Sequence, residues 1–203
     1  MRMIESDLTQ AINNYNSRVS TLWGDKAQCG QMFEELIADI TSTLPNLRHS
    51  IGDRDFLTSR IGNRVNSTLQ VDAHIRDAKT NELVACVESK CYIDLSMLKR
   101  AVNDFSHIYL TEDCTKNTKF IIFAGQRAFA KEGAEYQRAW LKEMTKKDLY
   151  IFIVNDVKSR SSKKPIHREC FGLDIKEIEN FRNLLAGVSG LPGLVICQVL
   201  FSL

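Results

Sequence analysis

The stretch Leu69-Gln70-Val71-Asp72-Ala73-His74-Ile75, which is followed by the polar segment 76–82 and then by Leu83-Val84-Ala85-Cys86-Val87-Glu88-Ser89-Lys90-Cys91, decides the fold. Apolar and other residues alternate in both halves, and this pattern predicts two antiparallel strands joined by a polar loop. Side chains point to opposite faces of a strand in turn, so Glu88 and Lys90 share a face. If the loop is centred on Thr80, Asp72 lies opposite Glu88, with the two Cβ atoms roughly 5 Å apart.

The predicted hairpin therefore brings two carboxylates and one ammonium to one spot. Two carboxylates this close repel each other, and the pKa of each is raised unless a positive charge lies between them. Mg²⁺ meets this need, because it takes oxygen ligands and one or two carboxylates suffice to hold it. A metal-bound water is a better nucleophile, and Lys90 would stabilise charge on a phosphate in the transition state.

The same three charges also fit a solvated hairpin face. An Asp followed at a distance by Glu-x-Lys is a weak pattern, because Glu and Lys are common residues. The flanking sequence decides between the two explanations.

Length and composition indicate one globular domain. The chain has 203 residues, of which 44% are hydrophobic and 26% charged, and this is ordinary for a soluble protein. No apolar run approaches a membrane span and no signal segment opens the sequence, so we expect no membrane association and a cytoplasmic protein with reduced cysteines. The net charge is only +2, so a nucleic-acid partner has to be argued from local charge.

Apolar periodicity predicts the other elements of the domain. We divide the chain into an N-terminal helix (1–26), a core (27–155) and a basic loop with a C-terminal extension (156–203). Strand, helix and strand over 119–154 suggest a right-handed parallel crossover. The predicted elements are helices over 1–24 and 27–44, one strand near 47–51 or 56–59, a helix capped by Asp94 or Ser96 that ends near Leu110, a strand over 119–124, a helix packed through Tyr136, Trp140, Leu141 and Met144, a strand over 149–154, a helix over 174–186, and an apolar tail over 191–203 that is a final strand or a subunit contact.

Arg, Lys and Asn residues gather in three segments beside these elements. Arg and Asn side chains contact base edges, and Arg also binds phosphates. Plain solvation explains the same residues equally well in the first two segments, and a solubilising linker is the alternative for the third. The candidates for DNA contact are Arg60, Arg64 and Asn66 in the segment 46–68, Lys99 and Arg100 on the helix after the hairpin, and Arg160, Lys163 and Lys164 in the basic loop 158–168.

The order of these elements and residues resembles the PD-(D/E)XK nuclease superfamily, whose fold is restriction-endonuclease-like. Asp72 and Glu88-Ser89-Lys90 stand where the motif residues of that family occur. The stretch Gly30-Gln31-Met32-Phe33-Glu34-Glu35-Leu36-Ile37-Ala38 is similar to the first helix of the family, in which a Glu directly after an aromatic residue points at the metal site. This favours Glu34 over Glu35, although from the pattern alone either is a helix-surface glutamate. Val71 departs from the family, because proline often precedes the aspartate.

The resemblance implies an α/β fold with a restriction-endonuclease-like core, in which helices flank a central mixed β-sheet in the order α-β-β-β-α-β. It also implies a catalytic core over 27–155. Asp72 and Glu88 would bind Mg²⁺, for which Mn²⁺ can substitute, and Lys90 would position or activate the water. Glu34 would help through a second metal or a metal-bound water, and the carbonyl of Ser89 is a further ligand candidate.

The compact single domain is most similar to a type II restriction endonuclease. This predicts a Mg²⁺-dependent, sequence-specific enzyme that hydrolyses phosphodiester bonds of double-stranded DNA and acts as a homodimer. Two alternatives stay open at this point. One is a repair or recombination nuclease of the same fold, such as a junction resolvase or an exonuclease, and the other is a non-catalytic DNA-binding module.

Overall fold

The computed structural model describes all residues except 1, 22–25, 52–56, 61–65, 112–113, 156–171 and 188–203. Only the backbone is described for residues 2–6, 20–21, 26–29, 51, 57–60 and 66–69. The described elements follow the chain in the order α1 (Arg2–Thr21), α2 (Lys26–Ser42), β1 (Leu47–Ile51), β2 (Leu57–Arg60), β3 (Asn66–Leu69), β4 (Ala73–Asp77), β5 (Leu83–Asp94), α3 (Leu95–Ile108), β6 (Lys119–Ala128), α4 (Lys131–Thr145), β7 (Leu149–Ile153) and α5 (Ile175–Leu185).

A mixed sheet of five strands forms the centre of the fold. Its strand order is β1-β4-β5-β6-β7, and β2 and β3 pair with each other in a separate hairpin. β1, β4 and β5 are antiparallel neighbours, whereas β5, β6 and β7 run parallel. The series α2, β1, β4, β5, α3, β6 therefore has the α-β-β-β-α-β order, and the predicted α/β fold with a flanked mixed sheet is confirmed.

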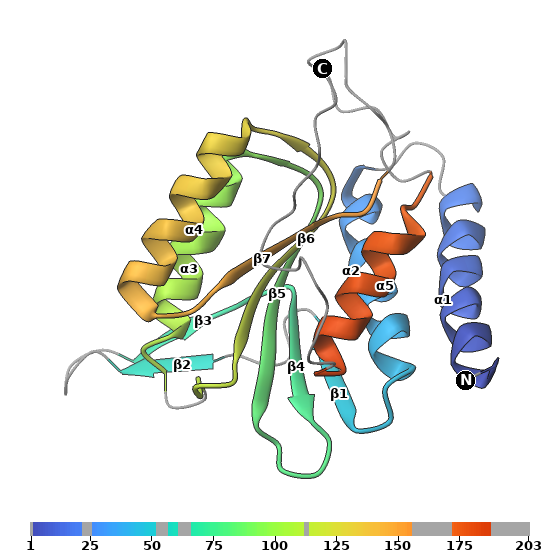
Figure 1. Ribbon diagram of the computed structural model, residues 1–203, viewed down its shortest axis with the longest axis horizontal. Helices are drawn as coiled ribbons and strands as arrows, with labels where there is room; N and C mark the ends of the chain where they lie inside the picture. Colours follow the sequence, from blue (N-terminus) through green and yellow to red (C-terminus); the bar gives the residue numbers. More distant parts are fainter. Residues whose placement is uncertain are drawn as a thin grey trace.

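Helices cover both faces of this sheet (Figure 1). α3 and α4 lie on one side, and α1, α2 and α5 lie on the other. The apolar side chains form two cores that match these layers, one centred on α2 and α5 and the other on α3 and α4. Alternation along β6 shows the division, because Phe123 belongs to the first core and its neighbour Ile122 to the second.

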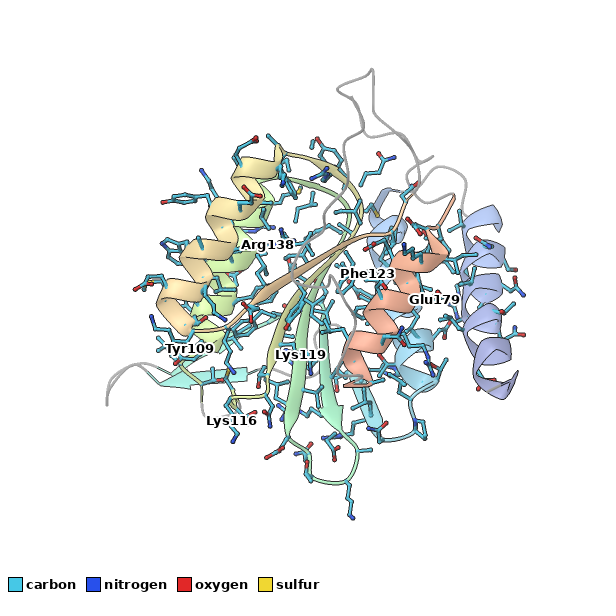
Figure 2. All side chains as sticks on the ribbon, in the orientation of Figure 1. Tyr109, Lys116, Lys119, Phe123, Arg138 and Glu179 are labelled. Carbon is cyan, nitrogen blue, oxygen red and sulfur yellow. The ribbon has the colours of Figure 1, made fainter. Side chains whose placement is uncertain are left out.

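Aromatic rings link the elements of the α2–α5 face. Phe123 of β6 lies 4.8 Å from Phe181 of α5 and 6.1 Å from Phe33 of α2, measured between ring centroids. Figure 2 shows Phe123 in the layer between the sheet and α5. Phe33 in turn contacts Tyr15 of α1 at 5.6 Å. This chain of rings holds three helices against one strand.

Several predicted boundaries are confirmed. Asp94 caps α3, since its carboxylate accepts a hydrogen bond from the backbone N–H of Met97 at 2.8 Å. β6 and β7 are parallel and are joined through α4, as the crossover requires. None of the described helices is both long and apolar enough to cross a membrane. The predicted basic loop 158–168 and apolar tail 191–203 lie outside the described residues.

One prediction about the number of strands and one about the packing of α4 are wrong. The segment 46–68 contains three strands instead of one, because β2 and β3 are short and rich in polar residues that obscure the alternation. Tyr136 and Met144 do not pack α4 against the sheet, since they are 65% and 59% exposed. The buried residues of that helix are Ala134, Gln137, Leu141 and Thr145, so Leu141 is buried as predicted.

We expect Phe123→Ala to lower the free energy of unfolding by about 3–5 kcal/mol, because the fully buried ring leaves a cavity between α2 and α5. Urea unfolding followed by circular dichroism measures this change. Tyr136→Ala is the control, since removal of an exposed ring changes the free energy by only about 0.5 kcal/mol. Equal effects of the two variants would contradict the described core.

Candidate active site

The hairpin formed by β4 and β5 carries the predicted site. Ala73 pairs with Val87, and two residues further along Ile75 pairs with Ala85. This is the register that the sequence predicts for a loop centred on Thr80, and it is confirmed. It aligns Asp72, which directly precedes β4, with Glu88.

A one-residue irregularity near the loop produces this register. Arg76 pairs with Leu83, so the register shifts by one residue and leaves Val84 as the extra residue of a bulge. At the loop itself the N–H of Asp77 donates to the carbonyl of Glu82. The loop is therefore centred between residues 79 and 80, and the bulge restores the alignment of Asp72 with Glu88.

The end of β4 explains the position of Asp72. β4 begins at Ala73, whereas β5 continues to Asp94, so the described part of the chain provides no strand to pair with β5 beyond Val87 on that side. Asp72 takes the next place, because its Oδ2 accepts a hydrogen bond from the backbone N–H of Ser89 at 2.8 Å. The Ser89 hydroxyl adds a longer contact of 3.4 Å to the same oxygen.

Lys90 joins the two carboxylates. Its Nζ lies 2.8 Å from Oδ2 of Asp72 and 2.8 Å from Oε1 of Glu88. The three side chains are mostly buried, with exposed fractions of 24% for Lys90, 24% for Asp72 and 14% for Glu88. Glu88 and Lys90 alternate with Val87, which belongs to the α2–α5 core, so they point toward the α3 face of the sheet.

Burial and neighbouring charges shift the pKa values of Glu88 and Lys90. Burial raises the pKa of Glu88, the nearby carboxylate of Asp72 raises it further, and Lys90 only partly offsets both effects. Burial would lower the pKa of Lys90, but the adjacent carboxylates of Glu88 and Asp72 raise it overall. The lysine is therefore held as an ammonium. The ionised form of Glu88 is destabilised by its surroundings, and an additional cation would stabilise it.

The oxygen donors of this site fit a hard divalent cation. Asp72 and Glu88 present carboxylates to one point, and two carboxylates suffice for Mg²⁺. In a strand the N–H and C=O of one residue point to the same side, so the Ser89 carbonyl also faces the edge beyond β4. Asp72 and Glu88 would hold the cation, with the Ser89 carbonyl as a further candidate.

Asp104 of α3 is a carboxylate that the sequence reasoning missed. Its charge raises the pKa of Glu88, and the charge of Lys90 acts on Asp104 in turn. It is half-buried and lies one helical turn from the buried residues Ala101 and Ile108, at the edge of the packed face of α3. That spacing beside apolar residues of the helix is a signal in the sequence.

Glu34 is not gathered with the hairpin carboxylates. It is half-buried on α2, which packs on the face of β5 opposite to α3. In the part of the chain that the structure describes, no group of three or more His, Cys, Asp or Glu side chains is placed to hold a metal ion. The roles predicted for Glu34, and those of Asp72, Glu88, Ser89 and Lys90, stay predictions.

The predicted DNA contacts are placed only in part. Lys99 and Arg100 are exposed on α3, the helix that also carries Asp104. Arg60 of β2 pairs with Asn66 of β3 at the end of the small hairpin, which contacts α3. Arg64, Arg160, Lys163 and Lys164 lie outside the described residues. Lys99 and Arg100 are therefore accessible to DNA, and the roles of all the predicted DNA-contacting residues stay predictions.

Comparisons with known proteins add little to this geometry. No family model matches the chain, and no curated protein matches it. Among solved structures, the chain is similar to the structure of P. aeruginosa ATCC27853 NucC in its cAAA-bound form, with a TM-score of 0.49 and 10% sequence identity. The match covers 89% of this chain and 96% of that chain. A likeness of this degree supports no functional assignment, which has to come from the site.

The raised pKa of Glu88 leads to a prediction for cation binding. A cation needs the carboxylate form, and Glu88 takes up a proton at a higher pH than an ordinary glutamate does. We therefore expect Ca²⁺ affinity, measured by calorimetry, to fall as the pH is lowered and to begin falling above 4.5, the usual pKa of Glu. In Asp72→Asn the repulsion is lost, so the remaining, weaker binding should fall at a lower pH. A fall confined to pH values below the usual pKa of Glu would contradict the raised pKa.

Proposed function

We propose that this protein is a Mg²⁺-dependent endonuclease that hydrolyses phosphodiester bonds of double-stranded DNA. One observation carries the proposal, namely that the carboxylates of Asp72 and Glu88 converge on the Lys90 ammonium at 2.8 Å each. The mixed sheet with its α-β-β-β-α-β order supports it, because that fold is the setting in which the resemblance expects these residues.

The three residues have two roles in this proposal. Asp72 and Glu88 bind the cation, which supplies a more acidic bound water and offsets charge on the scissile phosphate. Lys90 donates hydrogen bonds and positive charge, so it orients the attacking water or stabilises the additional negative charge of the transition state. In the cation-free site the carboxylates of Glu88 and Asp72 raise the pKa of Lys90, so it is an ammonium there.

The surroundings of the site suit a polyanionic substrate. Lys99 and Arg100 are exposed on α3 within a few turns of Asp104, where they can bind the DNA backbone. Sequence-specific cleavage of the type II restriction kind is the finer proposal. Cleavage of both strands at a palindrome would require a two-fold dimer with one site per strand.

The test is plasmid cleavage by the full-length protein with Mg²⁺. We expect Asp72→Ala, Glu88→Ala and Lys90→Ala each to lower the cleavage rate by about a hundredfold or more, the effect of removing one charged group that stabilises a transition state. Lys79→Ala and Glu82→Ala are matched controls, since both residues are exposed in the loop of the same hairpin. Gel electrophoresis follows the rates.

The products distinguish the finer alternatives. Discrete bands support a site-specific restriction enzyme, whereas cleavage only of branched or free-ended DNA supports a repair or recombination nuclease. The nuclease proposal fails if the three site variants cut as fast as the parent, or if the parent protein does not cut any of these substrates.

A further inference from the structure

We propose that Arg48 and Arg76 together bind one phosphate of the DNA backbone, at a distance from the scissile bond. The inference rests on the proposed function, because it takes the substrate to be double-stranded DNA. It adds one residue from β1 and one from β4 to the candidate DNA contacts.

The register of the sheet brings the two arginines together. β1 and β4 are antiparallel, and Arg48 lies directly opposite Arg76. Side chains in such a pair share one face of the sheet, with Cβ atoms roughly 5 Å apart, and like charges in these positions destabilise the pair. Stability therefore does not explain the two arginines, whereas an anion bound between them would remove the repulsion.

Asn81 in the hairpin loop holds both guanidinium groups. Arg48 donates a hydrogen bond to the side-chain Oδ1 of Asn81, and Nη1 of Arg76 donates to the backbone carbonyl of the same residue at 3.1 Å. Asn81 has a φ of 64°, a left-handed conformation that asparagine adopts more readily than most residues. It orients the two guanidinium groups toward one place, but it carries no charge that would neutralise them.

The carboxylate of the same loop is engaged elsewhere. Oδ1 of Asp77 accepts hydrogen bonds from the backbone N–H groups of Lys79 and Thr80 at 2.9 and 2.7 Å. Asp77 also lies opposite Leu47, which belongs to the α2–α5 core, so its side chain is on the other face of the sheet from that of Arg76. The positive charge of the arginine pair thus stays available to an external anion.

The arginine pair lies on the face of the sheet that carries the candidate active site. Arg76 pairs with Leu83, which belongs to the core centred on α3 and α4, whereas its neighbour Ile75 belongs to the α2–α5 core. Glu88 and Lys90 point to the same α3 face.

A single DNA strand can reach both places. Asp72 lies four residues before Arg76, which is roughly 13 Å along an extended chain. Arg48 is exposed and Arg76 is half-buried. Arginine suits a phosphate there, because its planar guanidinium donates two parallel hydrogen bonds to two phosphate oxygens and keeps its charge. We therefore place the scissile phosphate beside Asp72 and another phosphate of the same strand between the arginines.

The salt dependence of DNA binding tests this site. The anisotropy of a fluorescein-labelled duplex, titrated with the full-length protein in CaCl₂, gives the affinity at several KCl concentrations. On logarithmic scales the affinity falls linearly with salt, and the slope reports the number of phosphates neutralised. We expect each of Arg48→Gln and Arg76→Gln to weaken binding, and the double variant to reduce the slope by about 1, the effect of one lost phosphate contact.

Three further variants separate a phosphate contact from a structural role. Replacement of both arginines by lysine keeps the charges and should keep the slope of the parent. Asn81→Gly keeps the backbone conformation but removes the acceptor of Arg48, so it should weaken binding without a change of slope. Lys131→Gln combined with Lys142→Gln removes two exposed positive charges from α4, where they pair with Glu135 and Asp148, and should leave the slope unchanged.

Two outcomes would overturn the inference and leave the proposed nuclease intact. An unchanged slope in the double glutamine variant, with a lower melting temperature, would mean that the arginines only support the loop. A slope reduced by about 2 would mean that they contact separate phosphates. If the parent protein neither binds the duplex in CaCl₂ nor cuts plasmid in MgCl₂, the proposed function and this inference fail together.

Discussion

The backbone N–H of Ser89, which pairs with a side chain where the described residues offer no strand, governs the arrangement of the site. β5 continues beyond the start of β4, and the next N–H on that side, that of Ser89, would be buried without a strand partner. A buried amide without an acceptor costs about 1–3 kcal/mol, so the carboxylate of Asp72 at 2.8 Å is needed there for stability alone. The same bond fixes Asp72 beside Glu88 and Lys90, so the fold itself assembles the charged site.

The charge balance of this site is better explained by function than by stability. Two carboxylates share one ammonium, a third carboxylate on α3 adds to the repulsion, and burial raises the pKa of Glu88. A protein with well-packed apolar residues in place of a buried ion cluster is often as stable as the original or more stable. Perturbed pKa values of this kind gather at functional sites, and a surplus of negative charge is what a cation-binding site requires before its ion is bound.

The sequence allowed prediction of the parts that depend on local pattern. Alternation along residues 83–91 predicted β5, the continuous apolar run at 119–124 predicted β6, and the pairing of Asp72 with Glu88 followed from the two strands. Tertiary contacts decided the rest. Tyr136 has the right helical spacing to be buried, but the small residue Ala134 lets α4 approach the sheet on another face. The position of Asp104 beside the apolar stripe of its helix can be read from the sequence, but its effect on Glu88 depends on how α3 packs over β5, which no short pattern contains.

The bulge at Val84 determines on which face of the sheet the acidic pair lies. Opposite residues of an antiparallel pair share a face, so a hairpin without the extra residue would align Asp72 with Val87, which points into the α2–α5 core. The aspartate and the glutamate would then stand on opposite surfaces of the sheet, separated by its backbone. The number of residues in the loop and the bulge together thus decides whether Asp72 and Glu88 lie on the same face of the sheet. In a natural or engineered variant of this hairpin, one residue gained or lost in the loop is harmless to the site only if the bulge changes with it.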